Sequence, residues 1–158
     1  MSDFRISKDS KKWFDEISKK DELGLDFDIY YFCLMAGLST GYQKDLPASE
    51  TLAFVETFPN KYKDKSKIII SLFLARELSS LGVNLTDKKE AHEHISRLIS
   101  PLSPNFLSDE GMKQLNKYSA AGFEVLKDEW FVDKPRTLES FLRIFSNKIS
   151  TGVKDFQI

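Results

Sequence analysis

Residues 27–38 constrain the fold of this chain more than any other stretch. Ten of these twelve residues are apolar or aromatic, and no charge follows Asp28 within the stretch. An amphipathic surface helix keeps a polar stripe that faces water, and this stretch has almost none. It must therefore be covered on nearly all sides, either by the rest of the fold or by a partner.

The composition provides ample material for such a cover. The chain has 158 residues, of which 41% are hydrophobic and 13 are Phe. This length fits one domain, or one domain with an extra arm. The formal net charge of −1 argues against strong non-specific binding to nucleic acid or to a membrane surface. A local basic patch remains compatible with this balance.

Cys33 is the single cysteine and lies inside the apolar stretch. A lone cysteine forms no internal disulfide, so we interpret Cys33 as a small buried hydrophobe in a reducing compartment. No signal peptide opens the chain, and no apolar run reaches the ~20 residues needed to span a bilayer. We therefore expect a soluble cytoplasmic protein without a membrane partner.

The N-terminal part reads as a strand followed by two helices. Residues 3–7 alternate polar and apolar side chains, which predicts a short strand or an extended arm. Ser7 or Asp9 would cap a helix that runs to about Lys20. Asp26 would cap the central helix, which should end between Gly37 and Gly41.

The middle of the chain contains its least regular part and a second buried segment. We expect a short helix within Ser49–Phe58. Three isoleucines at 68–70 favour a strand locally, but the apolar pattern continues at helical spacing to Leu81. Length therefore favours a helix, with Gly82 as its end.

Three more helices are predicted in the C-terminal half, starting at Asp87, at Ser108 or Asp109, and at Thr137. In the second of these, Ala120–Gly122 would permit close approach of another helix or would bend its own. The predicted fold class is all-α: a bundle of about six helices with a short N-terminal strand or arm. Residues 1–41 would form a strand-helix-helix unit and residues 42–158 a helical bundle, unless both belong to one compact domain.

No catalytic constellation stands out. His92 and His94 are two residues apart on a predicted helix, so they point about 200° apart and cannot share a metal ion. Residues 37–41 lack the lysine and the spacing of a phosphate-binding loop. We expect no catalytic residue, no metal and no cofactor, and hence a protein that is not an enzyme. A small nuclease or hydrolase with an unrecognised site is the alternative.

Two sets of residues are candidates for binding. The first is basic and would contact nucleic-acid phosphates, although a solvated helix entry is the ordinary explanation for its second half; it comprises Arg5, Lys8, Lys11, Lys12, Lys61, Lys63, Lys65 and Lys67. The second set lies on the central helix and would contact a protein partner: Tyr30, Tyr31 and Met35. A chain this small has limited interior, and surplus apolar helix surface would be an interaction surface. Alternatively, the two apolar helices pack centrally and leave nothing over.

The order strand, helix, turn, helix over residues 4–7, 13–17, 24 and 27–38 is similar in outline to ribbon-helix-helix DNA-binding proteins. In that family two chains pair their strands and place the ribbon in the major groove. The resemblance implies a DNA-binding dimer in which Arg5 faces the bases. Asp26 and Asp28 depart from the pattern, because carboxylates at the start of the second helix would repel a phosphate.

A second resemblance covers most of the chain. Residues 27–38, 107–112, 121–124 and 138–142 look like small accessory proteins of bacterial anti-phage defence operons, with the phosphorothioation-linked (Dnd-type) systems nearest. This implies a subunit that works with a larger ATPase, helicase or nuclease, and it carries over no functional residue. Our favoured expectation is a non-enzymatic helical adaptor of a bacterial complex that acts on nucleic acid, with self-association and direct DNA contact left open.

Overall fold

The N-terminal segment starts as a strand and becomes helical at Ser7. The computed structural model describes residues 3–19, 23–84 and 86–155. Its first elements are β1 (Phe4–Ser7), α1 (Lys8–Trp13) and α2 (Asp15–Lys19). The Ser7 hydroxyl accepts the Ser10 N–H at 3.2 Å, so Ser7 rather than Asp9 caps α1. The single helix predicted here is instead two, separated by a turn at the buried Phe14, and Lys20 lies outside the described residues.

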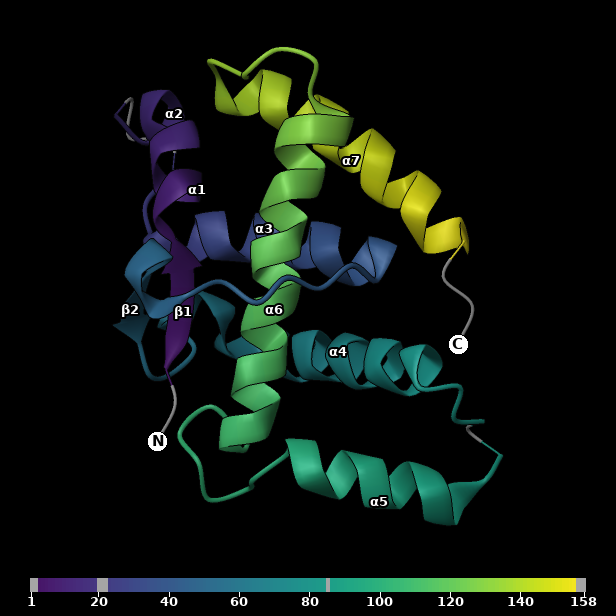
Figure 1. The fold of residues 1–158 in the computed structure, drawn as a ribbon. Helices are drawn as coiled ribbons and strands as arrows, with labels where there is room; N and C mark the ends of the chain where they lie inside the picture. Colours follow the sequence, from purple (N-terminus) through teal and green to yellow (C-terminus); the bar gives the residue numbers. More distant parts are fainter. Residues whose placement is uncertain (1–2, 20–22, 85, 156–158) are drawn as a thin grey trace.

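The central helix α3 (Asp26–Thr40) crosses α6 (Asp109–Val125) in Figure 1, and the two helices are in contact. A Cβ added at Gly37 would collide with the Tyr118 carbonyl, and one added at Gly122 would collide with the Cys33 carbonyl. This confirms the prediction that the small residues of Ala120–Gly122 permit close approach of another helix. Gly41 ends α3 with φ of +81°, within the predicted range.

β1 pairs antiparallel with β2 (Thr51–Val55), which follows the short 3₁₀ helix η1 (Ala48–Glu50). The register places Ile6 opposite Leu52 and Phe4 opposite Val55, with an irregularity beside Phe4. The helix predicted within 49–58 is therefore wrong. The reason is tertiary: β1 offers an unpaired backbone edge, and the Phe54 ring, set in the strand, reaches the Phe27 ring at 6.0 Å.

Two helices stack below α3 in the view of Figure 1: α4 (Ser66–Ser80), preceded by the 3₁₀ helix η2 (Asn60–Lys65), and α5 (Lys88–Leu98). The prediction of a helix over 68–81 is confirmed, and Gly82 follows it with φ of +71°. The Asp87 carboxylate accepts the Glu90 N–H at 3.2 Å, which confirms Asp87 as a cap.

The C-terminal helices close the other side of the core. Ser108 caps α6, and Thr137 accepts the Ser140 N–H at 3.1 Å as the predicted cap of α7 (Leu138–Asp155). Between them, α6 widens into one π-helical turn, η3 (Leu126–Trp130). The buried Phe141 ring lies 5.2 Å from Phe131 and 5.1 Å from Phe14, so the last helix is held to the first ones by aromatic contacts.

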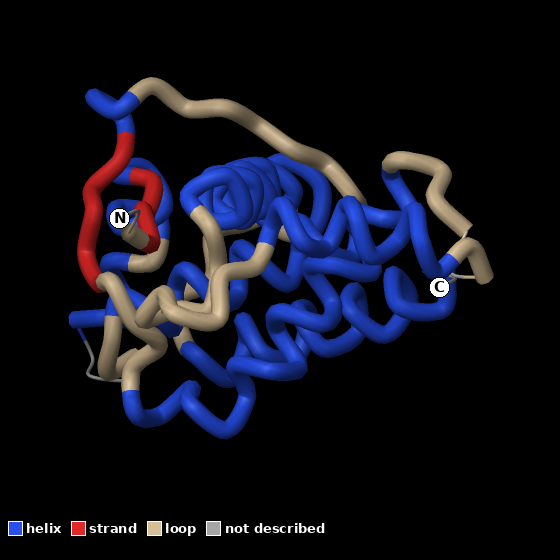
Figure 2. Tube along the Cα trace, turned by 90° about the horizontal axis from the view of Figure 1, so that it is seen from below, coloured by secondary structure: helices blue, strands red, loops and turns tan. Residues whose placement is uncertain are grey.

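The architecture is all-α with a short two-stranded sheet at one end, as expected from the sequence, although the structure pairs two strands where one was predicted. One continuous hydrophobic core includes residues from both predicted units, for example Phe4 and Leu34 from 1–41 and Phe73, Leu115 and Phe141 from 42–158. Figure 2 shows the sheet at one margin of the helical body.

Candidate protein-binding surface

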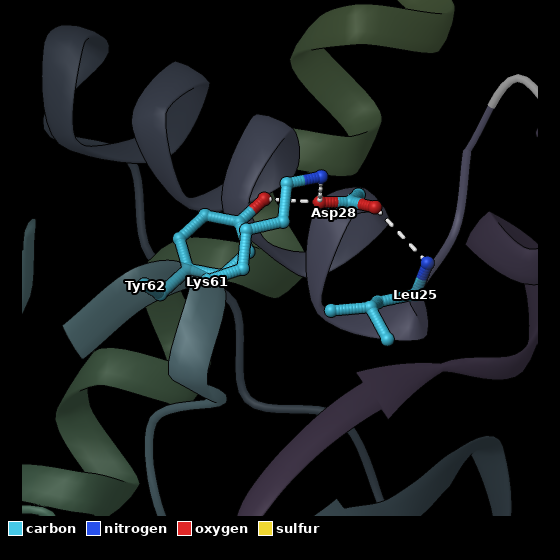
Figure 3. Close-up of polar contacts among 4 residues, drawn as sticks. All are labelled: Leu25, Asp28, Lys61 and Tyr62. Atoms are coloured by element: carbon cyan, nitrogen blue, oxygen red, sulfur yellow. Dashed lines mark hydrogen bonds and ion pairs between the residues drawn. The ribbon is translucent and has the colours of Figure 1, made fainter.

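The start of α3 is fixed by Asp28, whose side chain is buried (Figure 3). One carboxylate oxygen accepts the Leu25 backbone N–H at 3.0 Å and so caps the helix from inside its first turn. The other accepts Lys61 Nζ at 2.9 Å and the Tyr62 hydroxyl. The cap predicted at Asp26 is thus made by Asp28, because only Asp28 faces the fold; Asp26 pairs with Lys11 at the surface.

These contacts set the charge of Asp28. Burial alone would raise the pKa of the Asp28 carboxyl, but the hydrogen bonds from Tyr62, Lys61 and Leu25, together with the Lys61 charge, outweigh burial and lower it. Burial and the hydrogen bond to Asp28 raise the pKa of the Tyr62 hydroxyl. Asp28 is therefore an ionised anchor that attaches η2 to α3.

Lys65 continues this attachment one turn further along. Its Nζ lies 5.8 Å from the centroids of both the Tyr31 and the Tyr62 rings, and the two rings are 5.3 Å apart. Lys61 lies at the same distance from the Tyr62 ring. Cations at this distance are attracted to the faces of aromatic rings. Lys65, the residue immediately before α4, therefore lies beside Tyr31 of α3.

A second contact joins the same two helices at their other ends. Arg76 of α4 donates to the Leu38 carbonyl at 2.7 Å and to the Ser39 carbonyl at 2.9 Å, in the last turn of α3. Cations at a helix C-terminus satisfy its last carbonyls and its dipole. The two helices thus lie side by side between a Lys65–Tyr31 contact and an Arg76–Leu38 contact.

Four apolar side chains of α3 and α4 occupy positions between these two contacts. On α4, Ile68 and Leu72 lie on the row that joins Lys65 to Arg76, because residues three or four apart share a helix face. On α3, Met35 follows Tyr31 by one turn. Ile68 is 62% exposed, and the other three side chains are partly buried. We call these four residues, Tyr31, Met35, Ile68 and Leu72, the α3–α4 strip; it extends for about 16 Å between Lys65 and Arg76.

Of the three predicted partner-contact residues, Tyr30 requires correction. Its side chain has no exposed surface, and its hydroxyl donates to Asn116 Oδ1 at 2.8 Å. It faces α6 and the sheet, because α3 is central and other elements of the same chain cover most of its sides. Tyr31 and Met35 lie on the one side of α3 that remains partly open, so their role in binding stays a prediction.

The predicted basic residues divide between two places. Among those of the first group, the Arg5 guanidinium donates to Thr51 Oγ1 at 2.9 Å, Lys11 pairs with Asp26 at 3.3 Å, and Lys8 and Lys12 are exposed. All four lysines of the second group are exposed, and Lys61 and Lys65 each lie 5.8 Å from the Tyr62 ring centroid. No hydrogen bond, ion pair or ring contact among the described residues joins the two groups.

Sequence reasoning missed a buried polar network under the segment that follows α3. Glu77 of α4 is buried and accepts the Tyr118 hydroxyl at 2.6 Å, and Gln43 donates to the same hydroxyl at 2.9 Å. Burial and the hydrogen bond to Glu77 raise the pKa of Tyr118. No signal in the sequence separates Glu77 from exposed helix glutamates. Its contacts stabilise the crossing of α4, α6 and the loop after α3.

The structure provides less support for an ion-binding or metal-binding site. A cavity of about 660 Å³ opens between β1, residues 44–48 and α6, but four carboxylates and four cationic side chains line it, so it has no net charge to attract an ion. Within residues 3–19, 23–84 and 86–155, no group of three His, Cys, Asp or Glu side chains is placed to hold a metal. None of the helices in this part of the chain is long and apolar enough to cross a bilayer.

The chain matches no protein-family model, no curated protein and no solved structure.

Proposed function

We propose that this protein is a non-enzymatic accessory subunit that docks through the α3–α4 strip onto a larger protein of a bacterial complex acting on nucleic acid. The observation that carries the docking surface is the run of partly exposed apolar side chains between Lys65 and Arg76. The sequence resemblance to accessory proteins of anti-phage defence operons supplies the class of complex, with an ATPase, helicase or nuclease as the partner.

The surface favours a partner segment that is apolar with acidic flanks. Four apolar side chains form its centre, and Lys65, which contacts the Tyr31 ring, lies at its start; Lys63 and Lys67 flank Lys65 in the sequence. Lys63 and Lys67 are exposed and form no ion pair among the described residues. A length of about 16 Å accommodates three turns of a partner helix. An amphipathic acidic helix laid along the strip would bury its apolar face and neutralise Lys65.

The ribbon-helix-helix alternative, a DNA-binding dimer, receives less support from β1. Backbone groups alternate in direction along a strand. The N–H of Arg5 donates to Asn116 Oδ1 at 3.1 Å, and Asn116 Nδ2 donates to the Asp3 carbonyl at 3.1 Å, while the other edge of β1 pairs with β2. Both edges of β1 are thus occupied within the chain, so pairing with a second β1 would require Asn116 or β2 to leave.

The proposal is tested by introducing a glutamate on the α3–α4 strip and, as a control, the same residue at an exposed leucine elsewhere. The tagged chain is expressed in its native host as wild type, as Ile68→Glu, and as Leu102→Glu, which places the same charge at a 98% exposed leucine in the loop before α6. We expect one large protein to co-purify with wild type and with Leu102→Glu, and to be lost with Ile68→Glu. The isolated complex should then show nucleic-acid-dependent ATPase or nuclease activity that the subunit alone lacks.

Two results would contradict the proposal. If Ile68→Glu retains the partner as well as Leu102→Glu does, the strip is not the docking surface. If the purified chain shifts DNA in a gel at low salt, with an affinity that falls steeply as salt rises, direct DNA binding replaces the adaptor function.

A further inference from the structure

β2 forms the outer edge of the two-stranded sheet. In Figure 2 it is the strand that follows the long loop and η1, and it runs along the margin of the molecule with β1 on its inner side. Among the described residues β2 pairs only with β1, while the Phe54 ring of β2 packs against Phe27 and Tyr30 of α3. In the described part of the chain, the other long edge of β2 therefore has no strand partner, and Leu52 and Ala53 are exposed.

The open side presents unpaired backbone groups at Ala53. Because the Arg5 N–H points to Asn116 and away from β2, Arg5 and Ala53 form a non-hydrogen-bonded pair. The N–H and C=O of Ala53 consequently point away from β1. Neither group forms a hydrogen bond outside the β1–β2 pair among the described residues, and Ala53 is exposed. The Thr51 carbonyl on the same edge has only a long contact, 3.5 Å from Arg5 Nη2.

The side chains of β2 do not protect this edge. Exposed edge strands are usually protected by lysine, by proline or by an inward charge. Residues 51–55 are Thr, Leu, Ala, Phe and Val, without a charge or a proline, and Leu52 is 41% exposed. The only such feature is the irregularity in the register beside Phe4. Strand edges of this kind accept added strands from other chains.

The charges that flank β2 indicate which chain fits. Glu50 and Glu56 are exposed, one at each end of the strand. In an antiparallel pair of two β2 strands centred on Ala53, each Glu50 would lie opposite the other copy's Glu56, and like charges directly opposite are destabilising. A segment with lysine or arginine at both ends of an apolar stretch would instead pair with both glutamates.

We propose that the free edge of β2 binds an extended, apolar segment of a protein partner whose two ends are basic, by adding a strand to the sheet. Ala53 forms the central backbone pair, Leu52 covers the apolar centre, and Glu50 and Glu56 select the basic ends. This site is separate from the α3–α4 strip, which favours an acidic helix, so either site can fail without the other.

The test uses a labelled peptide of alternating valine and threonine with lysine at each end, and a matched peptide with glutamate at each end. We expect the lysine-ended peptide to bind the full chain, measured by fluorescence anisotropy, and to slow hydrogen exchange of the Ala53 amide. The glutamate-ended peptide should bind at least about tenfold more weakly. Equal binding of both peptides, or binding without protection of Ala53, would overturn the proposal.

Variants test whether the peptide binds at the free edge of β2. Ala53→Pro removes only an outward N–H and leaves the bonds to β1 in place, since prolines are tolerated on strand edges in this orientation. We expect it to weaken lysine-ended peptide binding about tenfold at unchanged thermal stability. If Ala53→Pro unfolds the protein, the double change Glu50→Lys with Glu56→Lys replaces it and should reverse the preference between the two peptides. A dimer in sedimentation that Ala53→Pro dissociates would assign the edge to a second copy and overturn the partner proposed here.

Discussion

Gly122 of α6 lies directly against the backbone carbonyl of Cys33 in α3, with no space for a side chain between them. The two helices with the most extensive mutual contact, α3 and α6, therefore meet backbone to backbone at this point. Beside this crossing, the Tyr30 hydroxyl of α3 donates to Asn116 of α6, and on α6 the Tyr118 hydroxyl donates to Glu77 of α4. Asn116 also accepts the Arg5 N–H, so the same face of α6 contacts both α3 and β1.

Gly122→Ala should be among the most destabilising small changes in the chain. The new Cβ would collide with the Cys33 carbonyl, and backbone cannot move aside as a side chain can. We expect a loss of about 3 kcal/mol in the free energy of unfolding, measured by urea denaturation. Gly24→Ala is the control, since nothing lies within 4 Å of its added Cβ; an equal loss at Gly24 would contradict this account.

Asp28→Asn should destabilise the protein in a pH-dependent manner. The folded pKa of Asp28 is lowered, so its ionisation stabilises the fold above the pKa of the unfolded chain, and this contribution is lost as pH falls through the folded pKa. We expect a deficit of about 2 kcal/mol at neutral pH that shrinks below about pH 4. Asp26→Asn, on the exposed carboxylate, is the control in parallel urea titrations, and a deficit at Asp28 that is constant with pH would contradict the role assigned to its charge.

Cys33 should be inert in the folded protein. Its side chain is buried in the core, and burial raises the pKa of its thiol. The thiolate, which is the reactive form, is therefore scarce and unreachable. We expect no reaction with a disulfide reagent under native conditions and one equivalent of reaction in denaturant. Rapid native modification would mean that α3 separates from α6 readily.

Tyr118→Phe should test the buried network. The change removes the hydroxyl that donates to Glu77 and leaves that carboxylate with weaker partners inside the fold. We expect a loss of about 2 kcal/mol in the free energy of unfolding. Tyr42→Phe deletes the same group from a ring that is 55% exposed and should change stability by less than about 0.5 kcal/mol. Similar values for both variants would show that the network contributes little.

The sequence could predict the features that depend on neighbouring residues. Ser7, Asp87, Ser108 and Thr137 cap helices where their side chains reach the next turn, and Gly41 and Gly82 end helices because they adopt positive φ. The apolar run of 27–38 likewise required cover on most sides, and α3 is indeed central. These features can be predicted from the neighbouring residues and the helical period alone.

Tertiary contacts decided the rest. Residues 51–55 have a helix-compatible apolar pattern but form a strand, because β1 needs a backbone partner that no local pattern reveals. Asp28 rather than Asp26 caps α3, and Tyr30 is enclosed while Tyr31 stays partly open, because the position of α6 and η2 selects which side of α3 is inside. The packing of the helices decides which apolar residues stay exposed for a partner. The burial of a residue depends on the whole chain, whereas the spacing of apolar residues in the sequence describes one helix alone.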